Sequence, residues 1–581
     1  MSAPRGGSLL GSWAVAMGGA VLGVLWFLVV GGLRTLDPSD LDWVGDGDLA
    51  QHVLGWMHFR NAPWGLPLGR TPDLMTPLTM TVGFADSNPW VSVLLKPFSR
   101  WLPQDFQFIG PWFALCFALQ GWMGARLTGL FTPRPLDQLL GAALFAMAPV
   151  LLYRTGHDTL CAQWMILALL YLNLRPREDA RRTWNALGWA AGVNVLASGV
   201  HPYLEVMVFA LTLALLLSGV REHHLSRRSA AVVLGGLAVT VIGLFLLFGY
   251  VGQDVTASAA GFGAFSADTL TLFNAMGWTR WGVPSLNQGP GQYEGFGYLG
   301  TGVLALAGVT LAWRPSAWWP RVKAALRTHA PLMGAVLLMT LLAFSTVVTV
   351  SGWTVISIRG LTQPLQPLLA PFRSSGRFIW PLHYLVTTGV VALALWRWRA
   401  SPRVATGLLL ATVVLQAVET PAAWSRDRFE GVAWPRLRAP EWEQVDPFYR
   451  HIVLYPPDIR ISVMPCVLNT FPASAYVSFG DLAYRKHLTT NSGYSARLNE
   501  QKVDEVCQAL RADVNAGRLS PDTLYVVDRR EDETFRRLGE QVTCGTLDDF
   551  RVCVTAREGT FREALAKQVS AEPGRAGHRT R

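Results

Sequence analysis

The feature that most constrains the fold of this chain is a series of long apolar runs. The first, Leu9 to Gly32, is long enough to cross a hydrocarbon core of ~30 Å. It is longer than the apolar region of a signal peptide, usually about 7 to 15 residues, so we predict an anchor that is not cleaved. The same length criterion predicts roughly ten further spans: Phe108 to Leu130, Pro135 to Tyr153, Thr159 to Leu174, Leu187 to Gly199, Tyr203 to Val220, Ala230 to Val251, Tyr298 to Trp313, Ala330 to Val350, Phe378 to Trp398 and Val404 to Val418.

These runs predict an α-helical polytopic membrane protein with about 11 transmembrane helices. The low content of charged residues agrees, because 15% of the 581 residues are charged, against ~25% in soluble proteins. The formal net charge of +10 could indicate a nucleic-acid partner. The basic residues, however, form short clusters between apolar runs rather than one basic domain, so we expect membrane lipids and no nucleic acid as partners.

The positions of the basic residues predict the orientation. With a cytoplasmic N-terminus, five arginine-rich connections fall on the cytoplasmic side, as the positive-inside rule requires: 126–134, 175–182, 221–228, 314–327 and 397–403. The long connections and the region beyond Glu419 then lie outside the cytoplasm. We therefore predict a transmembrane module over residues 1–420 with a first external loop at 33–107, an extracytoplasmic domain over 421–565 and a basic disordered tail over 566–581.

The region beyond Glu419 has the pattern of a small mixed α/β domain. Three short runs are typical of strands, at 451–455, 523–527 and 551–554, and the pattern of 499–511 is typical of a helix. Outside the cytoplasm the four cysteines of this region could oxidise. Of the three pairings that four cysteines allow, we expect Cys466 with Cys507 and Cys544 with Cys553, the second closing a hairpin; free buried thiols are the alternative.

A polar stretch after the first span is the most conspicuous candidate site. If the chain is helical after Gly47, five residues share one face: Asp48, Gln51, His52, Gly55 and Phe59. Asp48 would lie in the first helical turn, where the helix dipole favours a carboxylate. The alternative is a solvated helix start on an interfacial helix, without chemistry.

All other unusual polar groups near the spans fall on the predicted external side, which is the strongest functional clue in the sequence. They are Asp86, Arg154, His157, His201, Arg280, Tyr293, Glu294, Arg373 and Arg377. Asp86 alone is typical of a turn, and the two histidines match no zinc spacing. Arg373 and Arg377 could simply snorkel, but external arginines oppose the topological bias, and two of them four residues apart can bind a phosphate.

Together these motifs resemble the GT-C class of integral membrane glycosyltransferases. More closely, they resemble a poorly characterised family of bacterial polytopic membrane proteins regarded as GT-C-like. The motifs that carry the resemblance are Gly47-Asp48-Leu49-Ala50-Gln51-His52, Asp86-Ser87-Asn88-Pro89, Glu294-Gly295-Phe296-Gly297, Phe372-Arg373-Ser374-Ser375-Gly376-Arg377 and Thr490-Asn491-Ser492-Gly493-Tyr494. The resemblance implies a bacterial cytoplasmic (inner) membrane protein whose C-terminal domain is periplasmic.

The class implies transfer of a sugar, a hexose or pentose, from a polyprenyl-phosphate donor to an extracytoplasmic glycan, lipid or protein of the cell envelope, usually with inversion. Asp48 matches the family motif and is expected to be the base, with Asp46 or Asp86 as alternatives. Arg373, Arg377 and Arg280 are expected to bind the donor phosphate. The candidates for substrate contacts are Gln51, His52, His157, His201, Tyr293 and Glu294. A divalent cation, Mg²⁺ or Mn²⁺, could bridge Asp48 and Asp86, but the sequence does not require one.

Two other function classes remain open. A transporter or flippase of lipid-linked saccharides would use the same charged groups for binding alone, and it predicts polar residues inside the spans, such as Asn194 and Glu205. A non-catalytic assembly protein of the envelope would place its function in the C-terminal domain and would leave Asp48 replaceable.

Overall fold

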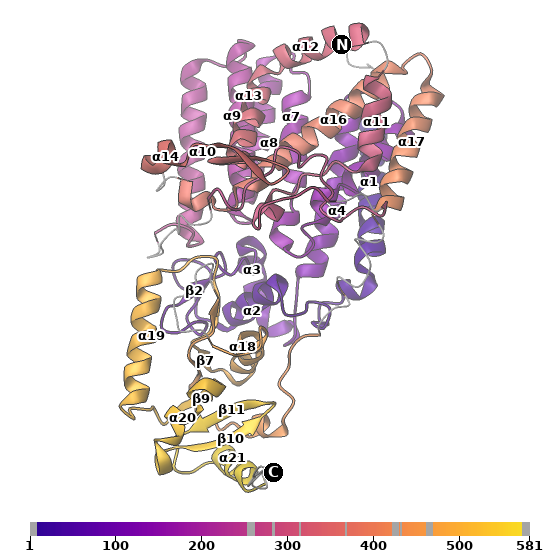
Figure 1. Cartoon of the computed structure of the whole chain (residues 1–581). Coiled ribbons are helices and arrows are strands. Elements are labelled where there is room, and N and C mark those ends of the chain that lie inside the picture. The colour runs from indigo at the N-terminus through magenta and orange to yellow at the C-terminus, as the bar shows by residue number, and fades with distance from the viewer. Residues whose placement is uncertain are drawn as a thin grey trace. The chain divides into compact units, whose positions relative to one another are not determined.

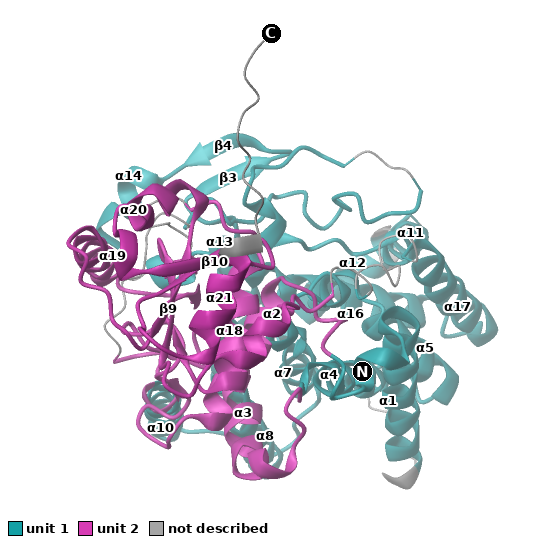
Figure 2. Cartoon of the chain, turned by 90° about the horizontal axis from the view of Figure 1, so that it is seen from below, with its two compact units in different colours: residues 1–40, 107–245, 257–431 teal, residues 41–106, 246–256, 432–581 magenta. Residues whose placement is uncertain are grey.

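The computed structural model describes residues 9–252, 262–281, 285–312, 315–365, 369–420, 429, 433–460 and 469–571. These residues are mostly helical, with one small sheet domain near the C-terminus, as expected (Figure 1). The chain divides into two compact units (Figure 2). Unit 1 comprises residues 1–40, 107–245 and 257–431, and unit 2 comprises residues 41–106, 246–256 and 432–581.

Unit 1 consists mainly of helices, most of them apolar. They are α1 (Leu9–Gly31), α4 (Ile109–Thr128), α5 (Pro135–Ala146), α6 (Pro149–Leu152), α7 (Trp164–Leu174), α8 (Ala180–Ser198), α9 (Pro202–Arg221), most of α10 (Arg227–Leu247), α11 (Thr301–Leu311), α12 (Pro315–Thr328), α13 (Ala330–Phe344), α16 (Trp380–Arg397) and α17 (Pro402–Glu419). Every predicted span therefore contains helix.

Fewer helices meet the length and composition expected of a membrane span than the sequence predicted. Among the described residues, six helices are long and apolar enough to cross a membrane: Gly11–Gly31, Pro135–Leu152, Pro202–Arg221, Arg227–Leu247, Ser375–Arg397 and Pro402–Glu419. A bent pair, Trp318–Thr328 with Ala330–Phe344, would make seven. Others are too short, since α7 and α11 have 11 residues each. These helices indicate a membrane protein, and the count of about 11 is not confirmed.

One predicted span ends early. The run Ala330 to Val350 is helical only as far as Phe344, and the chain then forms the antiparallel hairpin of β3 (Val347–Val350) and β4 (Trp353–Ser357). The β-branched residues of β3 explain the change, because side chains branched at Cβ favour strand over helix.

Glycines allow α1 and α4 to pack closely within unit 1. A Cβ atom on Gly23 would lie 2.0 Å from the carbonyl oxygen of Phe117, and one on Gly121 would lie 2.1 Å from that of Gly19. No side chain fits at these points, so the two backbones meet directly, as small residues permit between membrane helices.

The core of unit 2 is a five-stranded sheet with the order β10-β11-β9-β5-β7. Its strands are β5 (His451–Tyr455), β7 (Thr489–Thr490), β9 (Thr523–Val527), β10 (Thr543–Leu547) and β11 (Phe550–Val554). Strand β5 runs parallel to β7 and β9, and β11 runs antiparallel to β9 and β10. The three predicted strands and the predicted helix, α19 (Glu500–Asn515), are confirmed.

The predicted external loop folds with this sheet domain in unit 2. It forms α2 (Asp48–Asn61), β1 (Arg70–Thr71), β2 (Met80–Thr81) and α3 (Pro89–Leu95). Backbone hydrogen bonds join it to the C-terminal region, from Thr490 N to Asp73 O at 2.9 Å and from Ala496 N to Phe84 O at 2.8 Å. Helix α2 packs against α18 (Ala475–Lys486), and Arg485 pairs with Asp105.

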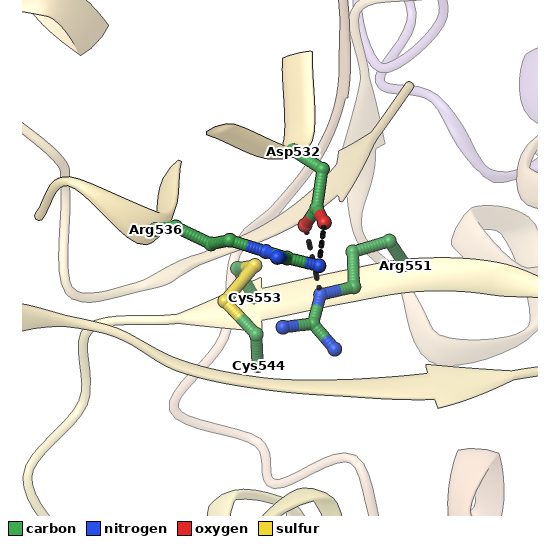
Figure 3. The surroundings of a disulfide bond; sticks show 5 residues. All are labelled: Asp532, Arg536, Cys544, Arg551 and Cys553. Atoms are coloured by element: carbon green, nitrogen blue, oxygen red, sulfur yellow. Dashed lines mark ion pairs between the residues drawn. A yellow bond between two sulfur atoms is a disulfide. The ribbon is translucent and has the colours of Figure 1, made fainter. Parts of the chain in front are cut away.

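The predicted Cys544–Cys553 disulfide is confirmed and joins directly opposed residues of β10 and β11 (Figure 3). Beside it, Arg536 and Arg551 pair with Asp532 of α20 (Asp532–Arg536). Cys507 is also disulfide-bonded, but its predicted partner, Cys466, lies outside the described residues. The disordered tail was predicted to begin at residue 566. Helix α21 (Thr560–Ala571) continues past that point, so residues 566–571 are helical instead.

Candidate functional site

The most distinctive polar feature of unit 1 is a buried group of three charges, which we call the arginine–glutamate cluster: Arg154, Glu294 and Arg377. Arg377 binds the Glu294 carboxylate with two hydrogen bonds, Nε to Oε2 and Nη2 to Oε1, both 2.9 Å. Arg154 Nη2 lies 2.8 Å from Oε2 and donates to the Glu294 carbonyl oxygen at 3.0 Å. The exposed fractions of the side chains are 8%, 10% and 11%.

Two guanidinium groups and one carboxylate leave this cluster with an excess positive charge. Burial by itself would raise the pKa of Glu294, but the charges of Arg154 and Arg377 outweigh it and hold the pKa below its usual value. Glu294 is therefore ionised. The Nε atom of Arg154 is buried and has no hydrogen-bond acceptor among the described residues. An anion is the ligand that such an environment favours.

Aromatic rings line the same cluster. The guanidinium of Arg154 lies 5.2 Å from the ring centroid of Tyr153 and 5.4 Å from that of Trp380. The guanidinium of Arg377 lies 4.9 Å from the ring of Tyr203. These cation–π contacts restrict the directions in which the guanidinium groups can point.

Two glycines of the sequence motifs allow three chain segments to meet at the cluster. A Cβ atom on Gly376 would lie 2.6 Å from Gly295 Cα, and one on Gly295 would lie 2.4 Å from Ala267 Cα. Gly376 N also donates to Phe265 O at 2.9 Å. Gly295 directly follows Glu294, and Gly376 directly precedes Arg377, so the backbones beside these two charged residues are in direct contact. A larger residue at either glycine would prevent this contact.

The predicted histidines lie beside the cluster. The rings of His157 and His201 are 5.6 Å apart, and His201 is 5.6 Å from Tyr203. His201 Nδ1 accepts a hydrogen bond from Tyr203 N at 3.1 Å and so caps α9, while the Tyr203 hydroxyl accepts one from Ser374 N at 2.8 Å. His157 is close enough to lower the pKa of Glu294 further.

The structure thus gathers His157, His201, Glu294 and Arg377 of the predicted site residues in unit 1. Arg373 is half-buried and directly precedes Ser374. Arg280 is exposed, and neither of these two arginines forms an ion pair with any residue in the described ranges. Tyr293 is 42% exposed, with its ring 6.1 Å from that of Phe265.

Arg154 was not predicted as a site residue. The sequence carried a signal for it, because this arginine follows the apolar run Pro135 to Tyr153 at its predicted external end, against the topological bias. Its ion pair with a carboxylate 140 positions away in the chain could not be read from the sequence.

The predicted catalytic residues lie in unit 2. Asp48 begins α2 and is exposed, and the preceding Gly47 is the N-cap residue. Asp46 is half-buried. Asp86 has a φ of 54° in the turn after β2, and its charge lies close enough to Tyr250 to add to the rise that burial causes in the pKa of that phenol.

The turn that carries Asp86 packs directly on α2. Gln51 Nε2 donates to Ala85 O at 3.4 Å, and a Cβ atom on Gly55 would lie 2.2 Å from Ser87 Oγ. His52 is 1% exposed on the same helix. From Leu49 to Arg60 every residue of α2 is buried, so the helix has no solvated side, whereas its two ends, Asp48 and Asn61, are exposed.

Within each unit, no three His, Cys, Asp or Glu side chains among the described residues lie close enough together to hold a metal ion. The predicted bridge between Asp48 and Asp86 by a divalent cation stays a prediction.

The polar residues that a transporter would need are buried in the helices of unit 1. Asn194 of α8 donates to Ala190 O at 2.7 Å and to Thr212 Oγ1 at 2.8 Å. Glu205 in the first turn of α9 is 1% exposed. Ser198 lies near Glu205, but its hydroxyl donates to Asn194 O at 2.8 Å. Neither oxygen of the Glu205 carboxylate therefore has a donor among the described residues.

Comparison with known families gives two matches. Residues 20–421 match the family described as "Domain of unknown function (DUF6311)", and residues 441–555 match the family described as "DUF6311 C-terminal domain". No curated protein matches the chain. The two matched regions together include all of the predicted site residues.

Proposed function

The chain belongs to the DUF6311 family, and from this premise we propose that it is a membrane glycosyltransferase that transfers a sugar from a polyprenyl-phosphate donor to an acceptor outside the cytoplasm. The observation that carries the proposal is the buried arginine–glutamate cluster with its excess positive charge. Buried charges in membrane proteins are costly, and an anionic group such as a lipid phosphate would offset this one.

We assign the phosphate contacts to Arg373, Arg377 and Arg154. Glu294 holds the two buried guanidinium groups in fixed directions, and Arg373, which has no ion pair among the described residues, supplies further donors. These charges stabilise the phosphate as the bond to the sugar breaks, so the departing polyprenyl phosphate needs no proton. Arg280 remains a phosphate candidate from the sequence alone.

We assign the base to Asp48, because it lies exposed at the start of α2 while the next twelve residues of that helix, Leu49–Arg60, are buried. Its carboxylate takes the proton from the acceptor hydroxyl as that oxygen attacks the anomeric carbon. The bond from the anomeric carbon to the phosphate oxygen breaks on the opposite face, which inverts the configuration. Asp46 and Asp86 are the alternatives, and His157, His201 and Tyr293 are candidates for sugar contacts.

The finer topology belongs to the same proposal. The protein would lie in a bacterial cytoplasmic membrane with the N-terminus inside, the C-terminal domain outside and about 11 helices in the membrane or at its surface.

The test is sugar transfer by the purified protein in lipid, with a panel of polyprenyl-phosphate sugars and acceptors. Asp48→Asn is expected to lower kcat by at least about a hundredfold while donor binding survives. Arg373→Ala is expected to weaken donor binding. Asp42→Asn and Arg359→Ala, which change exposed residues of the same charge outside the proposed site, are the matched controls. Full turnover by Asp48→Asn would refute its role as the base.

A carrier of lipid-linked saccharides is the second candidate, and the buried carboxylate of Glu205 favours it. A carrier predicts donor binding without turnover with every acceptor, together with movement of the donor across a vesicle membrane that Glu205→Gln abolishes.

A further inference from the structure

Unit 1 contains an open groove of about 480 Å³ where α7 ends and α8 begins. One part of its lining is basic, with Arg175, Arg177 and Arg182, and another is apolar, with Leu172, Ala186 and Trp189. The volume is in the range of small-molecule sites, roughly 300 to 1,000 Å³. The positive-inside rule places this connection on the cytoplasmic side, away from the proposed transfer chemistry.

The basic part of the groove is built around a buried arginine. Arg177 has only 5% of its side chain exposed, donates to Leu172 O at 2.9 Å and pairs with Glu222 at 3.1 Å. Its Nε atom is buried and has no acceptor among the described residues. Arg182 pairs with Glu178 at 2.9 Å, but both side chains are at least half exposed, so this pair is weak and open to exchange.

Arg175 adds a third, exposed guanidinium, which lies 5.9 Å from the ring of Tyr171. The acidic residues nearby are already engaged. Asp179 accepts a hydrogen bond from Arg182 N and caps α8, and Glu222 holds Arg177. An incoming phosphate would therefore meet guanidinium donors and would have to displace one exposed carboxylate, Glu178, from Arg182.

The apolar part of the groove distinguishes a lipid from a soluble phosphate. Trp184 and Trp189 of α8 are 45% and 73% exposed, as expected for tryptophans at a membrane interface. Between them, Gly188 lines the groove, and a Cβ atom there would have nothing within 4 Å. This open, apolar strip beside a basic end has the amphipathic character of a phospholipid.

We propose that this groove binds an anionic phospholipid, with the headgroup phosphate on Arg175, Arg177 and Arg182 and an acyl chain along Gly188 and Trp189. Basic pockets between helices on the cytoplasmic side are typical sites for such headgroups. The site is separate from the proposed glycosyltransferase chemistry and does not depend on it.

The experiment is native mass spectrometry of the full chain, titrated with phosphatidylglycerol or with zwitterionic phosphatidylcholine. Arg175→Gln combined with Arg182→Gln is expected to weaken the tightest phosphatidylglycerol binding by about tenfold or more and to leave phosphatidylcholine binding unchanged. The matched control is Arg397→Gln with Arg399→Gln, two arginines of the same predicted side that lie against Trp398 and Trp396 outside the groove. Equal losses in the two double variants would overturn the proposal.

A second variant tests the apolar end without any change of charge. Gly188→Trp fills open space, so it should preserve the fold and still weaken phosphatidylglycerol binding. Inorganic phosphate added in excess should not displace the lipid. Displacement by inorganic phosphate, with no effect of Gly188→Trp, would identify a site for a soluble phosphate and refute a lipid site.

Discussion

Glu294 is the residue on which the charge balance of the arginine–glutamate cluster depends. It is the only acidic member of that group, and its carboxylate meets Arg154 and Arg377 within 3 Å. A buried ion pair contributes little net stability, but removal of one partner leaves an uncompensated charge. Here, removal of the carboxylate of Glu294 would leave two uncompensated positive charges, on Arg154 and Arg377.

Glu294→Gln is therefore expected to lower the free energy of unfolding by about 3 to 5 kcal/mol, because two buried guanidinium groups would repel each other without a neutralising partner. Thermal unfolding of the protein in detergent measures the effect. The control, Glu443→Gln, removes an exposed acid paired with Lys486 and should cost less than about 1 kcal/mol. Equal shifts in the two variants would contradict the structural role of Glu294.

His58 is expected to make unit 2 sensitive to acid. It is 3% exposed, and this burial lowers the pKa of the imidazole below its usual value, outweighing the opposite effect of the hydrogen bond between Nε2 and Gly480 O at 3.0 Å. An unfolded histidine takes up a proton near pH 6.5. As the pH falls below about 6.5, protons bind the unfolded state in preference to the folded one, and the stability of the contact between α2 and α18 falls.

Hydrogen exchange of the α2 and α18 amides at about pH 7.5 and about pH 5.5, corrected for intrinsic rates, measures this sensitivity. Protection should fall on acidification in the wild type and change less in His58→Gln. His451→Gln, which alters a histidine whose side chain is 41% exposed, should behave as the wild type. The same acid response in His58→Gln as in the wild type would exclude His58 as its source.

At the scale of elements, the hairpin of β10 and β11 combines a local turn with a covalent link. Cys544 and Cys553 are nine positions apart and directly opposed in the register. A disulfide that closes a loop of this length lowers the conformational entropy of the unfolded chain, which stabilises the folded state by about 2 to 3 kcal/mol.

Replacing both residues, Cys544→Ser with Cys553→Ser, is therefore expected to lower the stability of this hairpin by about 2 to 3 kcal/mol. Hydrogen exchange of the β10 and β11 amides in the oxidised full chain reports the loss. A reducing agent should lower protection in the wild-type hairpin and add nothing in the double variant. Unchanged protection in the double variant would show that the strand pairing suffices without the link.

The hairpin of β3 and β4, unlike that of β10 and β11, was not predicted from the sequence. Apolar character alone predicted that the helix would continue to Val350, yet the chain leaves the helix after Phe344. Trp353 and Val355 of β4 are 75% and 60% exposed. Both helices and strands can be rich in apolar residues. The length of an apolar run therefore does not show whether its last residues continue the helix or form a strand.

At the scale of the whole molecule, the segments of each unit come from distant parts of the chain. Unit 2 joins residues 41–106 to 432–581, so the predicted external loop and the predicted external domain form one compact body. This grouping agrees with a common side of the membrane for both segments, as the basic residues predict.

The predicted topology can be tested with single cysteines on two exposed acidic positions. Glu178→Cys lies in a connection predicted to be cytoplasmic, and Glu505→Cys lies on α19 of unit 2. In intact cells, a membrane-impermeant thiol reagent should label residue 505 and reach residue 178 only after the membrane is opened. The remaining free cysteines in the described ranges, Cys116 and Cys161, are buried. Labelling of residue 178 from outside would reverse the orientation.

The sequence by itself determined the helical character, the apolar runs that contain the helices of unit 1, three strands of the sheet and α19, and it predicted the Cys544–Cys553 pair as one of several possibilities. These features depend on the length and period of local patterns, which act over a few neighbouring residues. It also singled out Glu294 and Arg377, though not the contact between them.

Only the tertiary structure decided which distant residues meet. Glu294 binds arginines 140 and 83 positions away, and Thr490 bonds to the backbone of Asp73. The number of helices that are long and apolar enough to span also depended on where each helix begins and ends. Such contacts arise because a buried charge or backbone group without a partner is costly, so the fold favours a partner that other parts of the chain bring near, and no local pattern in the sequence specifies that partner.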